Sequence, residues 1–191
     1  MENDTLNSQR YAVNIMLQSI GELPLNDDIE LPNAPQYILA VNILEEIKKN
    51  VLSEEWDCNT DKNYKLAVNS DKQIPVPCNV LNLYSTAKQY TIRNGFIYNK
   101  DNLTDRFDGE NVEVTIVWDL DFDSLPYALK YYIAIKSARV YASRVLVEAT
   151  AVKYSSDDEN AARVSALRAD TRARKNNMLD SYFGISASAR S

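Results

Sequence analysis

The sequence predicts an α+β protein: a helical bundle of about four helices, an inserted small antiparallel β domain and a flexible C-terminal tail. Apolar residues recur at helical spacing near both ends of the chain, whereas the middle alternates in the manner of strands. The last dozen residues are mostly small and polar. We therefore expect the bundle in residues 1–56 and 119–179, the β insertion in 57–118 and the tail in 180–191.

The first two helices are expected on either side of a proline-punctuated loop. Residues 5–20 carry apolar side chains at helical spacing, and Gly21 stands where the glycine after a helix belongs. After the loop, Pro35 suits the first turn of a second helix that runs toward Trp56. The predicted apolar stripe of this second helix is Ile38, Val41, Leu44, Ile47 and Val51.

The β insertion is recognised by its change of period. The segment YKLAV (64–68) alternates, and QIPVP (73–77) suits only an edge strand or an extended loop because proline cannot donate to a ladder. YTIRNGFIYN (90–99) predicts a two-residue type I′ hairpin, since Asn94-Gly95 tolerates positive φ at both central positions. VEVTIVW (112–118) is expected to be a further strand.

A third helix is predicted from Ser124, as its N-cap, to about Val147, with Pro126 in the first turn. Its apolar arc is wide, which is typical of a helix at the centre of a bundle. The members of this arc are Leu129, Tyr132, Ile133, Ile135, Val140, Ala142 and Leu146.

The last helix is expected over about 156–178. Ser156 and Glu159 have the spacing of a capping box, and the acidic start and basic end both suit the helix dipole. Its apolar residues are few and small. Such a helix either lies on the surface or packs against another subunit.

Composition argues against most enzymes. The chain has no histidine, the usual general base and metal ligand, and only four glycines, with no phosphate-binding glycine motif. Its net charge of -6 argues against general nucleic-acid binding, which needs a basic surface. Cys58 and Cys78 are expected to be free thiols, and the polar start MENDTLNSQR contains no apolar signal core, so we expect a soluble cytoplasmic product.

Asp119, Asp121 and Asp123 alternate as in the start of a calcium-binding loop. Counting from Asp119, however, the sixth position is Ser124 instead of glycine, and the twelfth is Lys130 instead of glutamate. We therefore interpret the segment as an acidic corner between a strand and a helix, and we predict no metal site.

Arg168, Arg172 and Lys175 form one basic stripe on the last helix. In isolation the stripe is typical of a solvated face, with an acidic protein partner as the next interpretation and nucleic acid after it. The sequence also has twelve tyrosines. Tyrosine is favoured at interfaces, although strand and half-buried positions account for many of them.

Several local strings, in a shared order from about residue 10 to 180, resemble the tail tubular protein A family of short-tailed bacteriophages (podoviruses). The most specific are the pattern N-x-x-L-x-S-I-G-E-x-P and the corner D-x-D-x-(S)-L/M-P. The strings are AVNIMLQSIGELPLND (12–27), EEW (54–56), FIYNKDNLTDRF (96–107), DLDFDSLPYALKYYIAIKSAR (119–139) and NNMLD (176–180).

The resemblance implies a structural virion protein, the adaptor, gatekeeper or head-to-tail connector. Twelve copies are expected to form a ring between the portal and the nozzle protein, tail tubular protein B, with tail fibres docked around it. DNA is expected to pass through the lumen without specific binding. The family implies no catalysis, cofactor, metal or membrane, and a place in the virion tail after assembly in the host cytoplasm. The alternative function is a small helical nucleic-acid-binding protein.

The resemblance also suggests two interaction regions. The C-terminal end of the chain is expected to grip the portal, and the hairpin at Arg93, Asn94 and Gly95 is expected to face the nozzle or the fibres. The candidate portal-interface residues are Arg168, Arg172, Lys175, Tyr182, Phe183 and Ile185.

Overall fold

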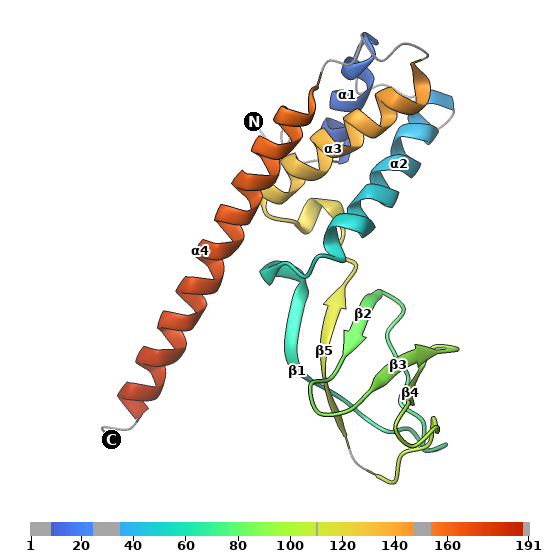
Figure 1. Ribbon diagram of the computed structural model, residues 1–191, viewed down its shortest axis with the longest axis vertical. Helices are drawn as coiled ribbons and strands as arrows, with labels where there is room; N and C mark the ends of the chain where they lie inside the picture. Colours follow the sequence, from blue (N-terminus) through green and yellow to red (C-terminus); the bar gives the residue numbers. More distant parts are fainter. Residues whose placement is uncertain (1–8, 25–34, 110, 147–153, 189–191) are drawn as a thin grey trace, which may run out of the picture. The chain divides into compact units, whose positions relative to one another are not determined.

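The computed structural model describes the backbone of residues 9–24, 35–109, 111–146 and 154–188, and the side chains of these residues as far as Lys175 (Figure 1). The chain divides into two compact units. One comprises residues 1–51 and 121–191, and the other comprises residues 52–120. Helices make up the first unit and antiparallel strands most of the second, which confirms the predicted α+β class.

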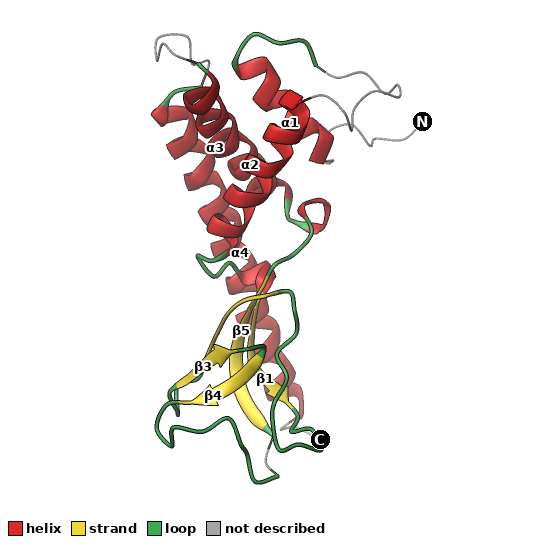
Figure 2. Ribbon diagram, turned by 90° about the vertical axis from the view of Figure 1, so that its right-hand side faces the viewer, coloured by secondary structure: helices red, strands yellow, loops and turns green. Residues whose placement is uncertain are grey.

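The helical unit contains α1 (Gln9–Ser19), α2 (Pro35–Leu52), α3 (Tyr127–Val145) and α4 (Ser156–Ser188). α3 packs against both α1 and α4, and α2 lies beside it in both views (Figures 1 and 2). The start of the first predicted helix, residues 5–8, and Val147 at the predicted end of the third lie outside the described residues. No helix among those described is long and apolar enough to cross a bilayer.

α3 is the central helix of this unit, as its wide apolar arc predicts. More than half of its residues are buried, and they point to several sides of the helix instead of one. From the predicted arc, only Val140 and Leu146 are half-buried instead of buried. The buried residues are Leu129, Lys130, Tyr132, Ile133, Ala134, Ile135, Ser137, Ala138, Tyr141 and Ala142.

α1 ends at the predicted glycine. Gly21 has φ +84°, a conformation that side chains with a Cβ rarely adopt. Its N–H donates to the carbonyl of Gln18 at 3.2 Å, and the N–H of Glu22 donates to the carbonyl of Leu17 at 3.1 Å. These two bonds form a Schellman motif and satisfy carbonyls that the helix leaves open.

α2 begins at Pro35 as predicted, but its buried face is rotated from the predicted stripe. Ile38 is 47% exposed and Val41 is half-buried. From Ile38 to Ile47 the predicted residues are three positions apart. Three residues rotate by about 300° around the helix axis, so each residue lies about 60° further round than the one before and the stripe does not stay on one face. The face that the fold buries is Ala40, Ile43, Leu44, Ile47, Val51 and Leu52.

The predicted start of the third helix at Ser124 is wrong. A 3₁₀ turn, η3 (Phe122–Ser124), comes first, and Pro126 then occupies the N-cap position of α3. Leu125 precedes a proline and is extended, with φ -72° and ψ 151°. Because the residue before a proline is sterically kept out of the helical region, α3 cannot extend back through Leu125 to Ser124.

The β unit contains β1 (Thr60–Leu66), β2 (Val80–Tyr84), β3 (Tyr90–Arg93), β4 (Phe96–Asn99) and β5 (Val112–Trp118). One sheet has the order β1-β5-β2, and the second is the β3-β4 hairpin (Figure 1). β5 pairs antiparallel with both of its neighbours. The core of the unit is Leu66, Ile74, Leu83, Ile97, Val112, Val114 and Ile116.

The predicted hairpin is confirmed. Ile92 pairs with Ile97 and Arg93 with Phe96, which leaves Asn94 and Gly95 as the two-residue turn with φ of 51° and 79°. The proline-containing segment 73–77 runs along β4 as an extended strip, with the N–H of Ile97 donating to the carbonyl of Ile74 at 2.9 Å. The strand β2 was not predicted.

The base of the β unit is tied by one buried side chain. Asn59 lies in the 3₁₀ turn η2 (Asp57–Asn59) just before β1, and it is 1% exposed. Its amide group donates to the carbonyl of Leu52, where the chain enters the unit, and to the carbonyl of Trp118, at the end of β5, both at 2.9 Å. One side chain therefore joins the entry and exit segments.

We predict that Asn59→Ala lowers the free energy of unfolding of the β unit by about 2 kcal/mol, because the hydrogen bonds of the buried Asn59 amide to the carbonyls of Leu52 and Trp118 are lost. Chemical denaturation followed by tryptophan fluorescence measures the change. Asn111→Ala, at an exposed position of the same unit, is the matched control and should change stability by less than about 0.5 kcal/mol. Equal effects of the two substitutions would contradict the role given to Asn59.

Candidate interaction surfaces

Each residue of the acidic corner makes a structural hydrogen bond, through its side chain or its backbone. The Asp123 carboxylate accepts a hydrogen bond from the backbone N–H of Gln9 at 3.0 Å, at the start of α1. The Asp121 carbonyl accepts from the hydroxyl and the N–H of Ser124, at 2.7 and 3.0 Å. Asp119 belongs to the other unit, where its N–H donates to the carbonyl of Asn79 at 2.8 Å.

Lys130 closes the same corner. Its side chain is 8% exposed, and its ammonium donates to the carbonyl of Asp123 at 2.7 Å. A calcium loop would need a bidentate carboxylate at this position, whereas here a cation points back at the loop. Among the described residues, no group of three or more cysteine, aspartate or glutamate side chains is arranged to hold a metal ion.

The start of α4 is held by a capping box, one residue earlier than predicted. The hydroxyl of Ser155 accepts from the N–H of Asp158 at 3.2 Å, and the Asp158 carboxylate accepts from the N–H of Ser155 at 2.7 Å. Hydrogen bonds from Ser155 lower the pKa of Asp158. Ser156 is therefore already inside the helix, and Glu159 instead pairs with Arg139 of α3.

α4 has two different faces along its described side chains. Ala162 and Ala166 are buried, one turn apart. The basic stripe Arg168, Arg172 and Lys175 is exposed throughout. The neighbouring cation, Arg174, forms an ion pair with Asp170 at 2.8 Å and does not belong to the stripe.

α4 continues past its predicted end at Met178 as far as Ser188, and its 33 residues span about 50 Å at the usual rise of a helix. No proline interrupts this stretch, and one glycine inside a helix costs only about 1 kcal/mol. Tyr182, Phe183 and Ile185 therefore lie on the helical backbone instead of in a separate tail. The structure joins them to the basic stripe as one continuous helix.

The predicted hairpin surface belongs to the β unit, whereas the C-terminal candidates belong to the helical unit. Arg93, Asn94 and Gly95 are all exposed at the turn between β3 and β4. The guanidinium of Arg93 lies 3.7 Å from the ring centroid of Tyr98, in cation–π contact. This contact orients Arg93 along the hairpin, and the turn itself is free of side-chain bulk at Gly95.

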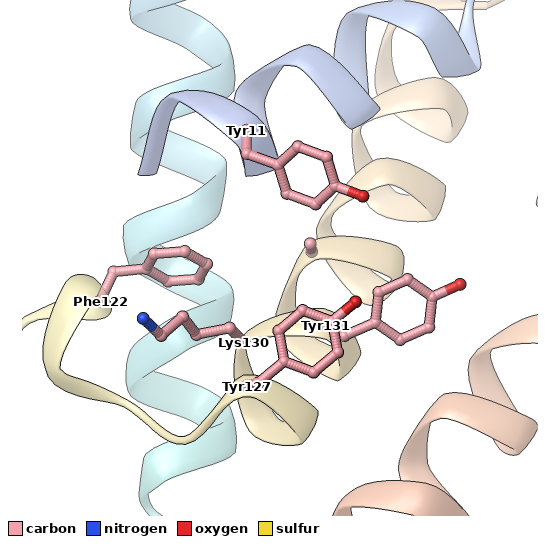
Figure 3. Close-up of a pocket in the computed structure, with 6 residues that line it drawn as sticks. Tyr11, Phe122, Tyr127, Lys130 and Tyr131 are labelled. Atoms are coloured by element: carbon pink, nitrogen blue, oxygen red, sulfur yellow. The ribbon is translucent and has the colours of Figure 1, made fainter. Parts of the chain in front are cut away.

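Sequence reasoning missed an aromatic surface on the helical unit. Tyr127 and Tyr131, one turn apart on α3, are 56% and 38% exposed, and their rings stack with centroids 6.4 Å apart and planes 16° apart. They line a small recess with Tyr11, Phe122 and Lys130 (Figure 3). Its volume of about 10 Å³ holds roughly one water molecule, so it is not a ligand pocket.

Tyrosines around this recess influence one another. Burial raises the pKa of Tyr11, and the nearby Tyr127 and Tyr131 add to the rise. Burial likewise raises the pKa of Tyr154, just before α4, with contributions from Tyr131, Tyr11 and Asp158. These phenols therefore stay neutral at physiological pH, and the cluster offers aromatic surface with hydroxyl donors. The i, i+4 spacing of Tyr127 and Tyr131 was the available sequence signal.

We predict that calorimetric titration with Ca²⁺ gives no saturable heat in the micromolar range typical of sensor loops. The reason is that the Asp123 carboxylate already accepts a hydrogen bond and that Lys130, at the position where a calcium loop needs a carboxylate, places a positive charge in the corner. A saturable heat that disappears in Asp121→Ala would contradict this prediction.

We predict that Ser155→Ala lowers the free energy of unfolding of the helical unit by about 1 kcal/mol, the usual loss for a helix cap. Ser156→Ala is the matched control and should have almost no effect, because alanine suits a helix interior. Thermal denaturation of both variants locates the cap. A larger loss of stability for Ser156→Ala would show that Ser156 is the helix cap, as the sequence predicts.

The same cap should depend on pH. Folding lowers the pKa of Asp158 below its ordinary value of 3.8. The ionised carboxylate therefore stabilises the folded chain above pH 3.8, and this stabilisation is lost as the pH falls through the lower pKa of the folded state. The difference between the unaltered chain and Ser155→Ala should therefore be present at pH 7 and shrink in strong acid. A difference that stays constant from pH 7 down to strong acid would contradict the role given to Asp158.

Comparison with known proteins identifies a family that the chain matches. Residues 11–176 match the model of a family described as "Tube: Tail tubular protein". A search of curated proteins found no match.

Proposed function

Because the chain belongs to the tail tubular protein family, and is therefore a structural component of a bacteriophage tail, we propose that it forms the adaptor ring between portal and nozzle. The observation that carries this proposal is α4. Among the described side chains of α4, residues 156–175, only two alanines are buried, so most of this part of the helix surface is not covered by its own bundle. Such a helix is suited to contact other subunits.

The proposed partners follow from the adaptor role. The ring contains several copies of the chain, twelve in our proposal, and it contacts the portal on one side and the nozzle protein, tail tubular protein B, on the other. Tail fibres dock around it. DNA passes through the lumen during ejection without specific binding, which a net charge of -6 favours because phosphates are repelled. Assembly takes place in the host cytoplasm.

We assign no catalytic function and no cofactor to the chain. The alternative function, nucleic-acid binding through the stripe of Arg168, Arg172 and Lys175, has less support. Single-stranded nucleic acid is bound by cationic grooves with stacking aromatics, whereas residues 156–175 of α4, which carry this stripe, include no aromatic side chain but have the apolar Val164 and Leu167 beside it. A protein partner accounts for apolar and basic side chains on one helix face.

Two surfaces serve the two directions of the adaptor in this proposal. The C-terminal part of α4, with Arg172, Lys175 and the apolar anchors Tyr182, Phe183 and Ile185, grips an acidic surface of the portal. The hairpin turn at Arg93, Asn94 and Gly95 meets the nozzle or the fibres. These surfaces belong to different units of the chain, so each can be altered without touching the other.

We predict that a chain shortened after Leu179 keeps its melting temperature within a few degrees but binds the portal about tenfold more weakly or worse. Removing interface aromatics commonly costs more than 1 kcal/mol each. Co-purification with tagged portal protein measures the attachment. Arg93→Ala is the control and should leave portal attachment unchanged. Equal recovery of the shortened and full chains would exclude this end of the chain as the grip.

A further inference from the structure

The outer face of the first half of α4 is apolar and unpartnered within its own unit. Val164 is 45% exposed and Leu167 is 40% exposed. Arg168 shares their side of the helix, since residues three and four positions apart are neighbours on a helix surface. Ala162 and Ala166, the buried residues of α4, lie on the opposite side, where α4 packs on α3.

A second unpartnered surface lies on α3, at the stacked pair Tyr127 and Tyr131. This pair is rigid because each ring holds the other, and its hydroxyls suit an interface that is partly wet. Tyrosine is enriched at the centres of protein interfaces. Tyr11 faces the pair from α1 across the recess, so the aromatic surface extends over two helices (Figure 3).

The two surfaces have complementary charge. The exposed charges at the edge of the aromatic surface are acids: Asp121 and Asp123 lie on either side of Phe122, which lines the recess, and Asp158 acts on Tyr154 next to Tyr131. The cation in the recess lining, Lys130, is buried and donates to the carbonyl of Asp123. The α4 face is bordered by a base, Arg168. Arginine combines an ion pair with stacking on an aromatic ring, so it fits a tyrosine surface with an acidic rim.

We propose that the outer face of α4 at Val164, Leu167 and Arg168 docks onto the Tyr127–Tyr131 surface of a second copy of this chain. The two halves cannot meet within one chain, because Val164 and Leu167 point away from the side of α4 that packs on α3. Because the two surfaces lie on different elements, the contact can repeat head-to-tail from copy to copy, and such a contact forms a ring where its rotation closes.

This inference rests on the proposed adaptor ring and specifies its contact between copies. In this inference Arg168 contacts a second copy of the chain, whereas Arg172 and Lys175, further along the helix, contact the portal. A second copy is the occupant because both halves of a complementary pair stand exposed on the same chain. An unrelated partner would explain one of the surfaces and leave the other uncovered.

Cysteine cross-linking of the full chain tests the contact. In a background of Cys58→Ser and Cys78→Ser, which removes two exposed thiols, one preparation carries Tyr131→Cys and the other carries Leu167→Cys. The mixture is treated with a bis-maleimide whose reach is about the 8–10 Å between packed helix axes. Covalent trapping accumulates product even from a weak contact. All altered positions are exposed or half-exposed, and thermal denaturation verifies that each variant is folded.

We expect a cross-linked dimer in the mixture and little in either preparation alone. Ser165→Cys is the control in place of Leu167→Cys, because Ser165 is exposed on α4 but a quarter of a turn off the proposed face. Arg168→Glu should lower the yield about two- to fivefold, as expected for a surface ion pair. The contact is overturned by absence of the mixed dimer, by an equal yield with Ser165→Cys, or by equally abundant product within one preparation.

Portal co-purification of the same variants separates this inference from the adaptor function. If the mixed dimer is absent while portal binding persists, the adaptor role stands and this contact is wrong. If portal binding is also absent from the unaltered chain, the proposed function fails as well.

Discussion

Burial of α3 from several sides is the constraint on which the helical unit depends. Tyr132, Ile133 and Ile135 are successive or nearly successive residues, so they point in different directions, and all are essentially inaccessible to water. A helix that is apolar around most of its circumference needs neighbours on each side. α1, α2 and the first turns of α4 are these neighbours, and the corner at Pro126 sets where α3 can begin.

Features encoded locally were predictable from the sequence. The turn at Asn94-Gly95 and the helix end at Gly21 depend on the backbone freedom of a few adjacent residues, and both appear where expected. Features that depend on a competition between neighbours were not. Ser155 and Ser156 can each cap a helix, and the choice is decided by Asp158 and by the pairing of Glu159 with α3. β2 was missed because its pairing with β5 is non-local and its middle residue is a polar asparagine.

Of the candidate surfaces, the basic stripe could be located from spacing alone, because helical periodicity places Arg168, Arg172 and Lys175 together. Whether a side chain is exposed depends on packing partners that are distant in the sequence, and the spacing of residues along one helix carries no information about these partners. Tyr127 and Tyr132 are five residues apart on one helix, yet the first is 56% exposed and the second is buried. Lys130 is similar: its buried contact with Asp123 arises only when the corner folds back over α3.

The insertion of the β unit between α2 and α3 has a mechanical consequence. Any tension between a tail component bound to this unit and the rest of the chain is transmitted through two covalent connections. These connections meet at one end of the antiparallel pair β1 and β5, where Thr60 lies opposite Val117. Load applied at this end would unzip the pair one hydrogen bond at a time. The amide of Asn59 bridges both connections ahead of the first pair, so under such a load its two hydrogen bonds would bear the force before the strand pairing does.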